Sequence, residues 1–161
     1  MIRIEIANQQ SVFKIDRQQL RAAVRRVLKA HDYDSAEISL AIVDDTAIHE
    51  LNRQWLQHDY PTDVISFVLD DNEGHLEGEI VASADTASRV AGELGISPHD
   101  ELMLYIVHGM LHLVGFDDHS PADASAMRAA ERSILAELGI AAVDRDSLTV
   151  GKKPRAPRVP R

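Results

Sequence analysis

The chain has 161 residues, a length typical of one domain with a full hydrophobic core. Hydrophobic residues make up 45% and charged residues 27%, as in ordinary globular proteins. Because the chain contains no cysteine, disulfides and thiolate metal sites are excluded. The net charge of −9 argues against a nucleic-acid partner held by overall charge, and leaves a local basic groove as one way to hold such a partner.

The hydrophobic pattern predicts alternating strands and helices. Ile2, Ile4 and Ile6 alternate with polar residues, as on a half-buried strand. Leu20 and Val24 recur at helical spacing. In chain order the predicted elements are a strand at 2–6, a helix at 17–30 behind Asp16 as its cap, a strand at 38–43, a helix at 46–56 capped by Asp44 or Asp45, a strand at 64–69, a turn at 70–75, a strand at 79–83, a helix opened by Asp85 and closed by Gly95, a helix opened by Ser97-Pro98, and a last helix opened by Ser120-Pro121 that ends near Gly139.

These elements predict an α+β fold that is α/β-like, with about four strands in a small mixed sheet and about five helices in two or three layers. No internal linker interrupts residues 1–148, which we expect to form one domain. Residues 149–161 carry five of the 17 basic residues and three prolines, so we expect a disordered tail. The tail could touch RNA phosphates by charge or serve only solubility.

The N-terminus shows no pattern of a charged stretch followed by an apolar one, and the chain contains no apolar run of membrane-spanning length. We therefore expect a cytoplasmic protein without a membrane partner.

The stretch HGMLHLVGFDDH at 108–119 holds the residues that suggest chemistry. His108 and His112 are four residues apart, so on a helix both imidazoles share one face. The residues around them are apolar nearly all round, which predicts a buried helix whose imidazoles need polar partners. A metal explains this pattern better than two core histidines bound to carbonyls.

Gly115 suits the left-handed turn that ends a helix. Beyond it, Asp117, Asp118 and His119 can each return a ligand atom to the histidines. Two helical histidines, a glycine turn and a third ligand make a three-ligand site with open positions, as catalytic zinc uses. Gly109 stands where metalloproteases with an HExxH motif have their glutamate base, which argues against peptide hydrolysis.

Three segments resemble one known family. HGMLHLVGFDDH resembles the HGxLHLxGxDH signature of the YbeY family, single-domain bacterial endoribonucleases and rRNA maturation factors. Leu51-Asn52 followed by PTDVISF at 61–67 resembles its LN…PTDVLSF segment, and GEIV at 78–81 resembles its GDI strand. The combination is specific and covers most of the chain.

The resemblance implies an endoribonuclease specific for single strands that binds one Zn²⁺ per chain. Its implied role is small-subunit rRNA 3′-end maturation and ribosome quality control. The implied partners are rRNA precursor and the small ribosomal subunit or its proteins; DNA is not expected. His108 and His112 would be ligands, and His108 belongs to the catalytic centre.

The sequence departs from the family at the third ligand. The family usually has a histidine six residues after the second ligand, where this chain has Asp118, and the next residue is His119. Either Asp118 binds the metal or a one-residue shift lets His119 do so. We favour Asp118, because it keeps the length of the turn after Gly115.

Further candidates come from the LN…PTDVISF segment. The family's arginine four residues after the asparagine is Leu56 here, and Arg53 could replace its phosphate contact, although an exposed helix arginine is the simpler interpretation. Asp63 could act as a base or orient a ligand, or merely begin a strand, and Ser66 could line the site. His75 reads as a histidine of a polar loop, and Asp117 as a residue of the turn.

The sequence is also compatible with two other functions. The missing arginine and glutamate also suit a ribosome-associated assembly factor whose zinc is mainly structural. A metallohydrolase acting on peptides or small molecules is the third interpretation, which Gly109 disfavours.

Overall fold

The computed structural model describes residues 1–55, 64–141 and 143, with only the backbone for 52–55. It contains a four-stranded mixed sheet and five helices, which confirms the predicted α+β fold. The elements are β1 Ile2–Asn8, α1 Arg17–Ala30, β2 Ser35–Val43, α2 Asp45–Trp55, β3 Val64–Asn72, β4 His75–Ser83, α3 Ala84–Leu94, α4 Pro98–Leu113 and α5 Pro121–Glu137.

The strand order in the sheet is β1-β2-β4-β3, with β1, β2 and β4 parallel and β3 antiparallel to β4. The β3–β4 hairpin is tighter than predicted, because Asp70–Asn72 and His75 belong to the strands and only Glu73 and Gly74 form the turn. Both turn residues have positive φ, 46° and 82°, as type I′ hairpin turns require. The prediction of a turn at 70–75 was wrong because polar residues also occupy exposed strand ends.

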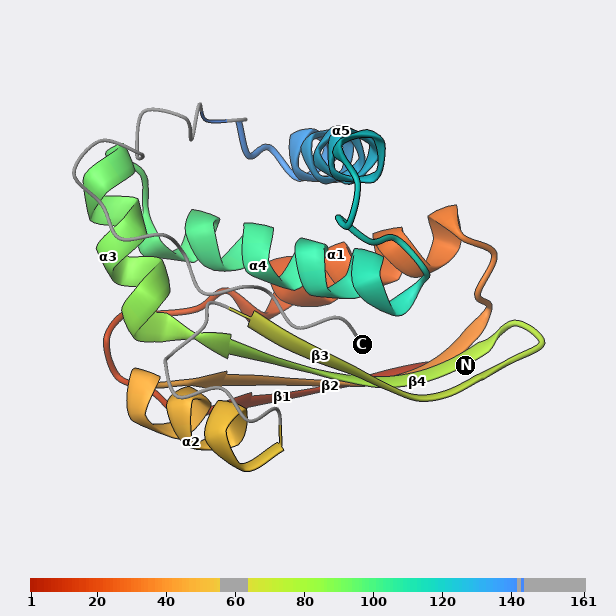
Figure 1. Cartoon of the computed structure of the whole chain (residues 1–161), viewed down its shortest axis with the longest axis horizontal. Helices are drawn as coiled ribbons and strands as arrows, with labels where there is room; N and C mark the ends of the chain where they lie inside the picture. Colours follow the sequence, from red (N-terminus) through yellow and green to blue (C-terminus); the bar gives the residue numbers. More distant parts are fainter. Residues whose placement is uncertain (56–63, 142, 144–161) are drawn as a thin grey trace.

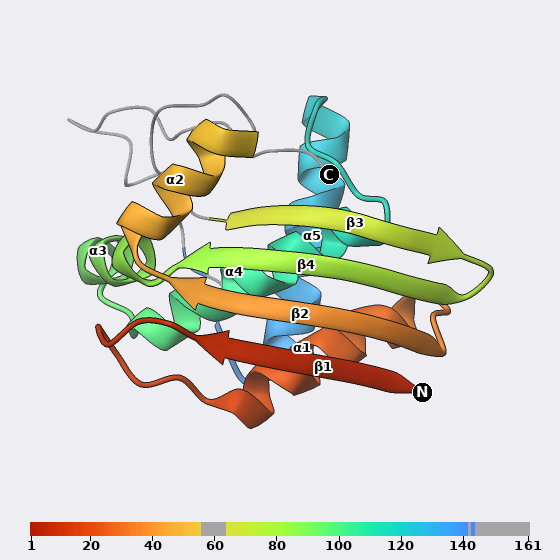
Figure 2. The same ribbon diagram turned by 90° about the horizontal axis from the view of Figure 1, so that it is seen from below.

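Helices lie on both faces of the sheet, as Figures 1 and 2 show. Helices α1 and α4 cover one face, α5 packs on the outer side of that layer, and α2 lies on the opposite face. The larger core fills the space between the sheet and α1, α4 and α5, and in a smaller cluster Ile48 of α2 packs on Val43, Ile65 and Val81 of the sheet. The site helix α4 contacts α1, α3, α5, β3 and β4, so it is buried from Glu101 to Leu113.

Two glycines let α4 approach the sheet closely. A Cβ at Gly109 would lie 3.0 Å from Ile80 Cγ2, and one at Gly78 would lie 2.8 Å from Leu113 Cδ1. Larger residues at either position would force α4 away from β4, because buried side chains pack without spare volume.

The predicted helix caps are mostly confirmed. Ser97 and Ser120 cap α4 and α5 ahead of their prolines, and Gly95 ends α3 at φ 71°. Helix α2 is capped by Asp44, which accepts the Ala47 N–H at 2.8 Å. The cap of α3 is Ser83 and not Asp85, whose carboxylate instead accepts the Asp45 N–H at 2.8 Å. Among the described residues, no helix has the length and apolarity needed to cross a membrane.

Candidate metal centre

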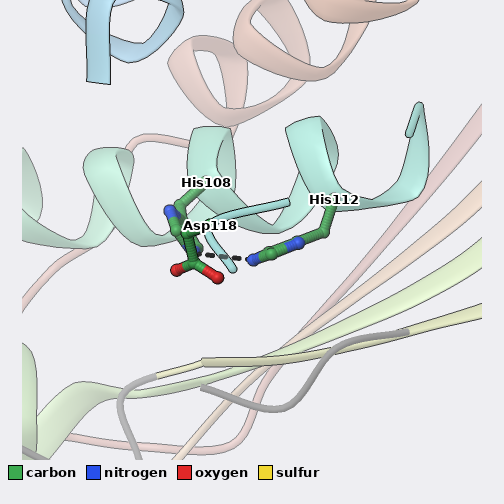
Figure 3. Close-up of side chains that lie close together, drawn as sticks. All are labelled: His108, His112 and Asp118. Carbon is green, nitrogen blue, oxygen red and sulfur yellow. Dashed lines mark hydrogen bonds between the residues drawn. The ribbon is translucent and has the colours of Figure 1, made fainter. Parts of the chain in front are cut away.

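The two motif histidines project from the same side of α4, as predicted (Figure 3). His108 and His112 are each only 3% exposed. Their Nε2 atoms face each other at 3.0 Å, and their rings meet edge to face. Helical spacing thus brings two strong ligand atoms to one buried point.

The chain reverses directly after α4. Gly115 has φ 113°, and the Phe116 N–H donates to the Leu111 carbonyl at 2.9 Å. The Phe116 carbonyl then lies 3.0 Å from His112 Nδ1. Because a carbonyl can only accept, Nδ1 of His112 carries the hydrogen and its Nε2 presents a lone pair.

The reversal also returns Asp118 to the histidines. Potential ligand atoms of His108, His112 and Asp118 all lie within 4.8 Å of one another, a group that does not include His119. Figure 3 shows the Asp118 carboxylate beside both rings, while the carboxylate itself is exposed. In this geometry the candidate third ligand is Asp118.

Asp117 serves the turn, as the sequence suggested. Its Oδ1 accepts the His119 N–H at 3.3 Å. That hydrogen bond is the main reason why the pKa of Asp117 lies below its ordinary value. Asp117 therefore stays ionised and holds the backbone that presents Asp118.

A residue from α5 completes the surroundings of His108. Glu131 Oε2 lies 2.5 Å from His108 Nδ1, and Glu131 is 9% exposed. An ionised carboxylate can only accept, so Nδ1 of His108 also carries the hydrogen. Sequence reasoning missed Glu131, although a carboxylate in register with the buried Met127, Ile134 and Leu135 of α5 was a usable signal.

This hydrogen bonding makes the site fit a cation. With both Nδ1 atoms donating, two neutral imidazoles aim their Nε2 lone pairs at each other across 3.0 Å, which is repulsive unless a proton or cation lies between them. Two nitrogens that bind one tetrahedral zinc at about 2.05 Å lie about 3.3 Å apart. Two imidazoles and a carboxylate are also ligands that zinc accepts.

Some of the other residues singled out in the sequence lie outside the described part of the chain, and others lie within it. Asp63 and the side chain of Arg53 lie outside the described residues, as does the tail 149–161. Ser66 is buried on β3 opposite Ile80, on the sheet face that carries α4. His75 is not a loop residue as predicted: it begins β4, where its ring lies 2.7 Å from Ser35 Oγ.

A second group of potential ligands lies on the β3–β4 hairpin. Asp70, His75 and Glu77 are within 4.8 Å of one another but are more exposed than the histidines of α4. His75 Nε2 lies 3.2 Å from Glu77 Oε1, which is an ordinary ion-pair geometry.

Comparison with known proteins identifies the family. The family model described as "Endoribonuclease YbeY" matches residues 5–139. A protein of that name from Rhodopirellula baltica is 50% identical over 109 residues, which are 66% of this chain and 56% of the relative. Relatives of the same name from Syntrophus aciditrophicus and Geobacter metallireducens are 41% and 39% identical, covering 82% and 85% of this chain and 87% and 96% of their own lengths.

A solved structure agrees with the fold. The solution structure of a Thermotoga maritima protein covers 95% of this chain and 100% of its own with a TM-score of 0.57 at 24% identity. At that identity the likeness concerns the fold alone. The extent of the family match, together with the identity of the relatives, shows that this chain belongs to the endoribonuclease YbeY family.

Proposed function

We propose that this chain is a zinc-dependent endoribonuclease that cleaves single-stranded RNA in small-subunit rRNA 3′-end maturation and ribosome quality control. Its family makes it a nuclease, a hydrolase of phosphodiester bonds. The proposed zinc dependence is supported by the buried pair of imidazoles with Asp118 beside it. Action on ribosomal RNA would place the protein in the cytoplasm, with the small subunit or its proteins as partners.

The number of ligands favours a catalytic metal over a structural one. Structural zinc sites are closed by four protein ligands, whereas catalytic sites have three and leave a position open. In the described part of the chain three ligand atoms converge at this site. An assembly factor with a purely structural zinc therefore has less support than the nuclease.

The chain's own residues would share the work. His108, His112 and Asp118 would hold the metal, and Asp63 would orient a ligand or accept a proton. Arg53 would contact a phosphate of the RNA if it replaces the family's arginine, which is Leu56 here. When bound, zinc would supply a nucleophilic water near neutral pH and stabilise charge on the phosphate oxygens.

Peptide hydrolysis by the HExxH route does not suit this site. Gly109 occupies the position of the glutamate base. It lies so close to Ile80 that a Cβ would be 3.0 Å from Ile80 Cγ2. A glutamate there would point into the sheet instead of toward a substrate. Of the third interpretation, a metallohydrolase acting on peptides or small molecules, the peptide part therefore loses its support.

The charge of the chain shapes how RNA would be held. All 26 acidic residues precede the tail 149–161, which carries five basic residues and no acidic one. The tail would add sequence-independent phosphate contacts, and removing it should lower affinity and its salt dependence together.

The test is zinc content and RNA cleavage of the purified wild type and His112→Ala. Cleavage is measured on single-stranded RNA, duplex RNA and rRNA precursor. The matched control is His75→Ala, which removes a histidine from the hairpin. We expect about one zinc per chain and cleavage in wild type and control, and loss of both in His112→Ala. Zinc without cleavage, alone or with small subunits, would favour the assembly factor, and no zinc in the wild type would refute zinc dependence.

A further inference from the structure

A buried carboxylate on α5 meets the metal centre from outside the ligand set. Glu131 lies on the inward face of α5 together with Met127, Ile134 and Leu135. Its side chain is 11% exposed, and Oε2 lies 2.5 Å from His108 Nδ1. The ligand motif and Glu131 come from different elements, so their contact depends on how α5 packs on α4.

The burial of Glu131 needs an explanation beyond packing. Taking a carboxylate out of water is unfavourable unless it is paired and hydrogen-bonded, and an apolar residue would fill the same face at no such cost. The ordinary place for a glutamate on this helix is shown by Glu137, which is exposed and forms an ion pair with Arg26 of α1. Glu131 is instead buried and hydrogen-bonded to the imidazole of His108.

We propose that Glu131 is the positioning residue of the metal centre. This proposal rests on the proposed zinc site. Glu131 acts through His108: because its carboxylate accepts the Nδ1 hydrogen, it fixes the tautomer and the rotation of the imidazole ring. Nε2 thereby keeps its lone pair, which faces His112 Nε2 and the group that includes Asp118. A carboxylate behind a ligand imidazole also strengthens that ligand, and its loss typically weakens metal binding 10–100-fold.

The two histidines have different hydrogen-bond partners at Nδ1, and only the partner of His108 carries a negative charge. His112 is held by a neutral carbonyl, that of Phe116, four residues away on the same turn. His108 is held by a carboxylate 23 residues away. With two neutral imidazoles, the charges of Asp118 and Glu131 together balance a divalent cation in a site where both rings are 3% exposed.

The experiment compares Glu131→Gln with Glu137→Gln, the same change on an exposed residue of α5. Zinc affinity is measured by competition with a chelator. The tautomer of His108 is read in the metal-free protein from imidazole nitrogen NMR signals. We expect Glu131→Gln to bind zinc 10–100-fold more weakly and to lose the pure Nδ1–H tautomer, because an amide can donate as well as accept. Glu137→Gln should match wild type in both measurements.

A third variant separates positioning from packing. Glu131→Asp keeps an acceptor-only carboxylate but removes buried volume, so it should bind zinc more tightly than Glu131→Gln, whereas a packing role predicts the reverse order. Wild-type affinity in Glu131→Gln, or an equal loss in Glu137→Gln, would overturn the proposal. If wild type binds no zinc, the metal site itself is refuted, and the tautomer signal still decides whether Glu131 positions His108.

Discussion

Gly109 of α4 lies so close to Ile80 of β4 that a side chain would crowd it: a Cβ on the glycine would be 3.0 Å from Ile80 Cγ2 and 3.2 Å from its Cδ1. Ile80 is fully buried, so it has little space to move. The contact places the flanking His108 beside the sheet, and it explains why the residue after the first histidine is a glycine.

We expect Gly109→Ala to destabilise the protein. Overpacking typically costs about 1–3 kcal/mol, and the better helix propensity of alanine returns up to about 1 kcal/mol, so a net loss of roughly 1 kcal/mol follows. The control is Gly92→Ala in α3, where a Cβ meets nothing within 4 Å and a gain of about 0.4–1 kcal/mol is expected. Urea unfolding measures both, and stabilisation by Gly109→Ala would contradict the close contact.

The third ligand can be assigned by comparing two neighbouring alanine variants. Asp118→Ala should remove most of the bound zinc, because its carboxylate lies within 4.8 Å of both imidazole ligand atoms. His119→Ala should retain the metal, because its side chain is exposed and lies outside that group. Elemental analysis gives the zinc content, and the reverse order would assign the ligand to His119.

The stability of the fold should depend on His99 below neutral pH. Burial lowers the pKa of His99 below the ordinary histidine value of 6.5. Its Nδ1 accepts the Asp16 N–H at 3.4 Å, and its Nε2 lies 2.8 Å from Gln19 Oε1. Protonation would break the bond to Asp16, since Nδ1 would then carry a hydrogen.

The unfolded chain therefore binds this proton at a higher pH than the folded chain does. The contribution of His99 to the free energy of unfolding is fully present above pH 6.5. It decreases as the pH falls toward the pKa of His99 in the folded chain. His99→Gln, which can keep both contacts, should flatten the decline in the free energy of unfolding below that pH. His119→Gln is the exposed control, and an equal flattening there would exclude His99 as the source.

The hairpin turn offers a stabilising substitution. Glu73 has φ 46°, a left-handed conformation that is unfavourable for most residues but tolerated by asparagine. Glu73→Asn would make the Asn-Gly pair typical of type I′ turns, with an expected gain of roughly 0.5–1 kcal/mol in thermal or urea unfolding. Glu79→Asn, on an exposed strand position, should give no gain; a gain there as large would argue against a turn effect.

Local signals in the sequence were sufficient for the site helix. The serine-proline starts of α4 and α5, the apolar character of 102–114 and the glycine after α4 all act within a few residues, and the structure confirms each. The same holds for His108 and His112, because helical geometry alone places residues four apart on one face. The roles of Arg53 and Asp63 stay predictions.

Long-range packing decided the rest. Glu131 reaches His108 across 23 residues only because α5 folds back over α4. The apolar periodicity of α5 indicates that Glu131 faces inward, but not which residue it contacts. The predicted turn at 70–75 was too long, because the polar residues Asp70–Asn72 are typical of turns in sequence but are paired with β4 in the structure. Asp118 lies beside the histidines, and His119 does not, because of the path of the backbone after Gly115. Residues near in sequence share a fixed local geometry, whereas contacts between elements form only where burial of the whole core brings them together.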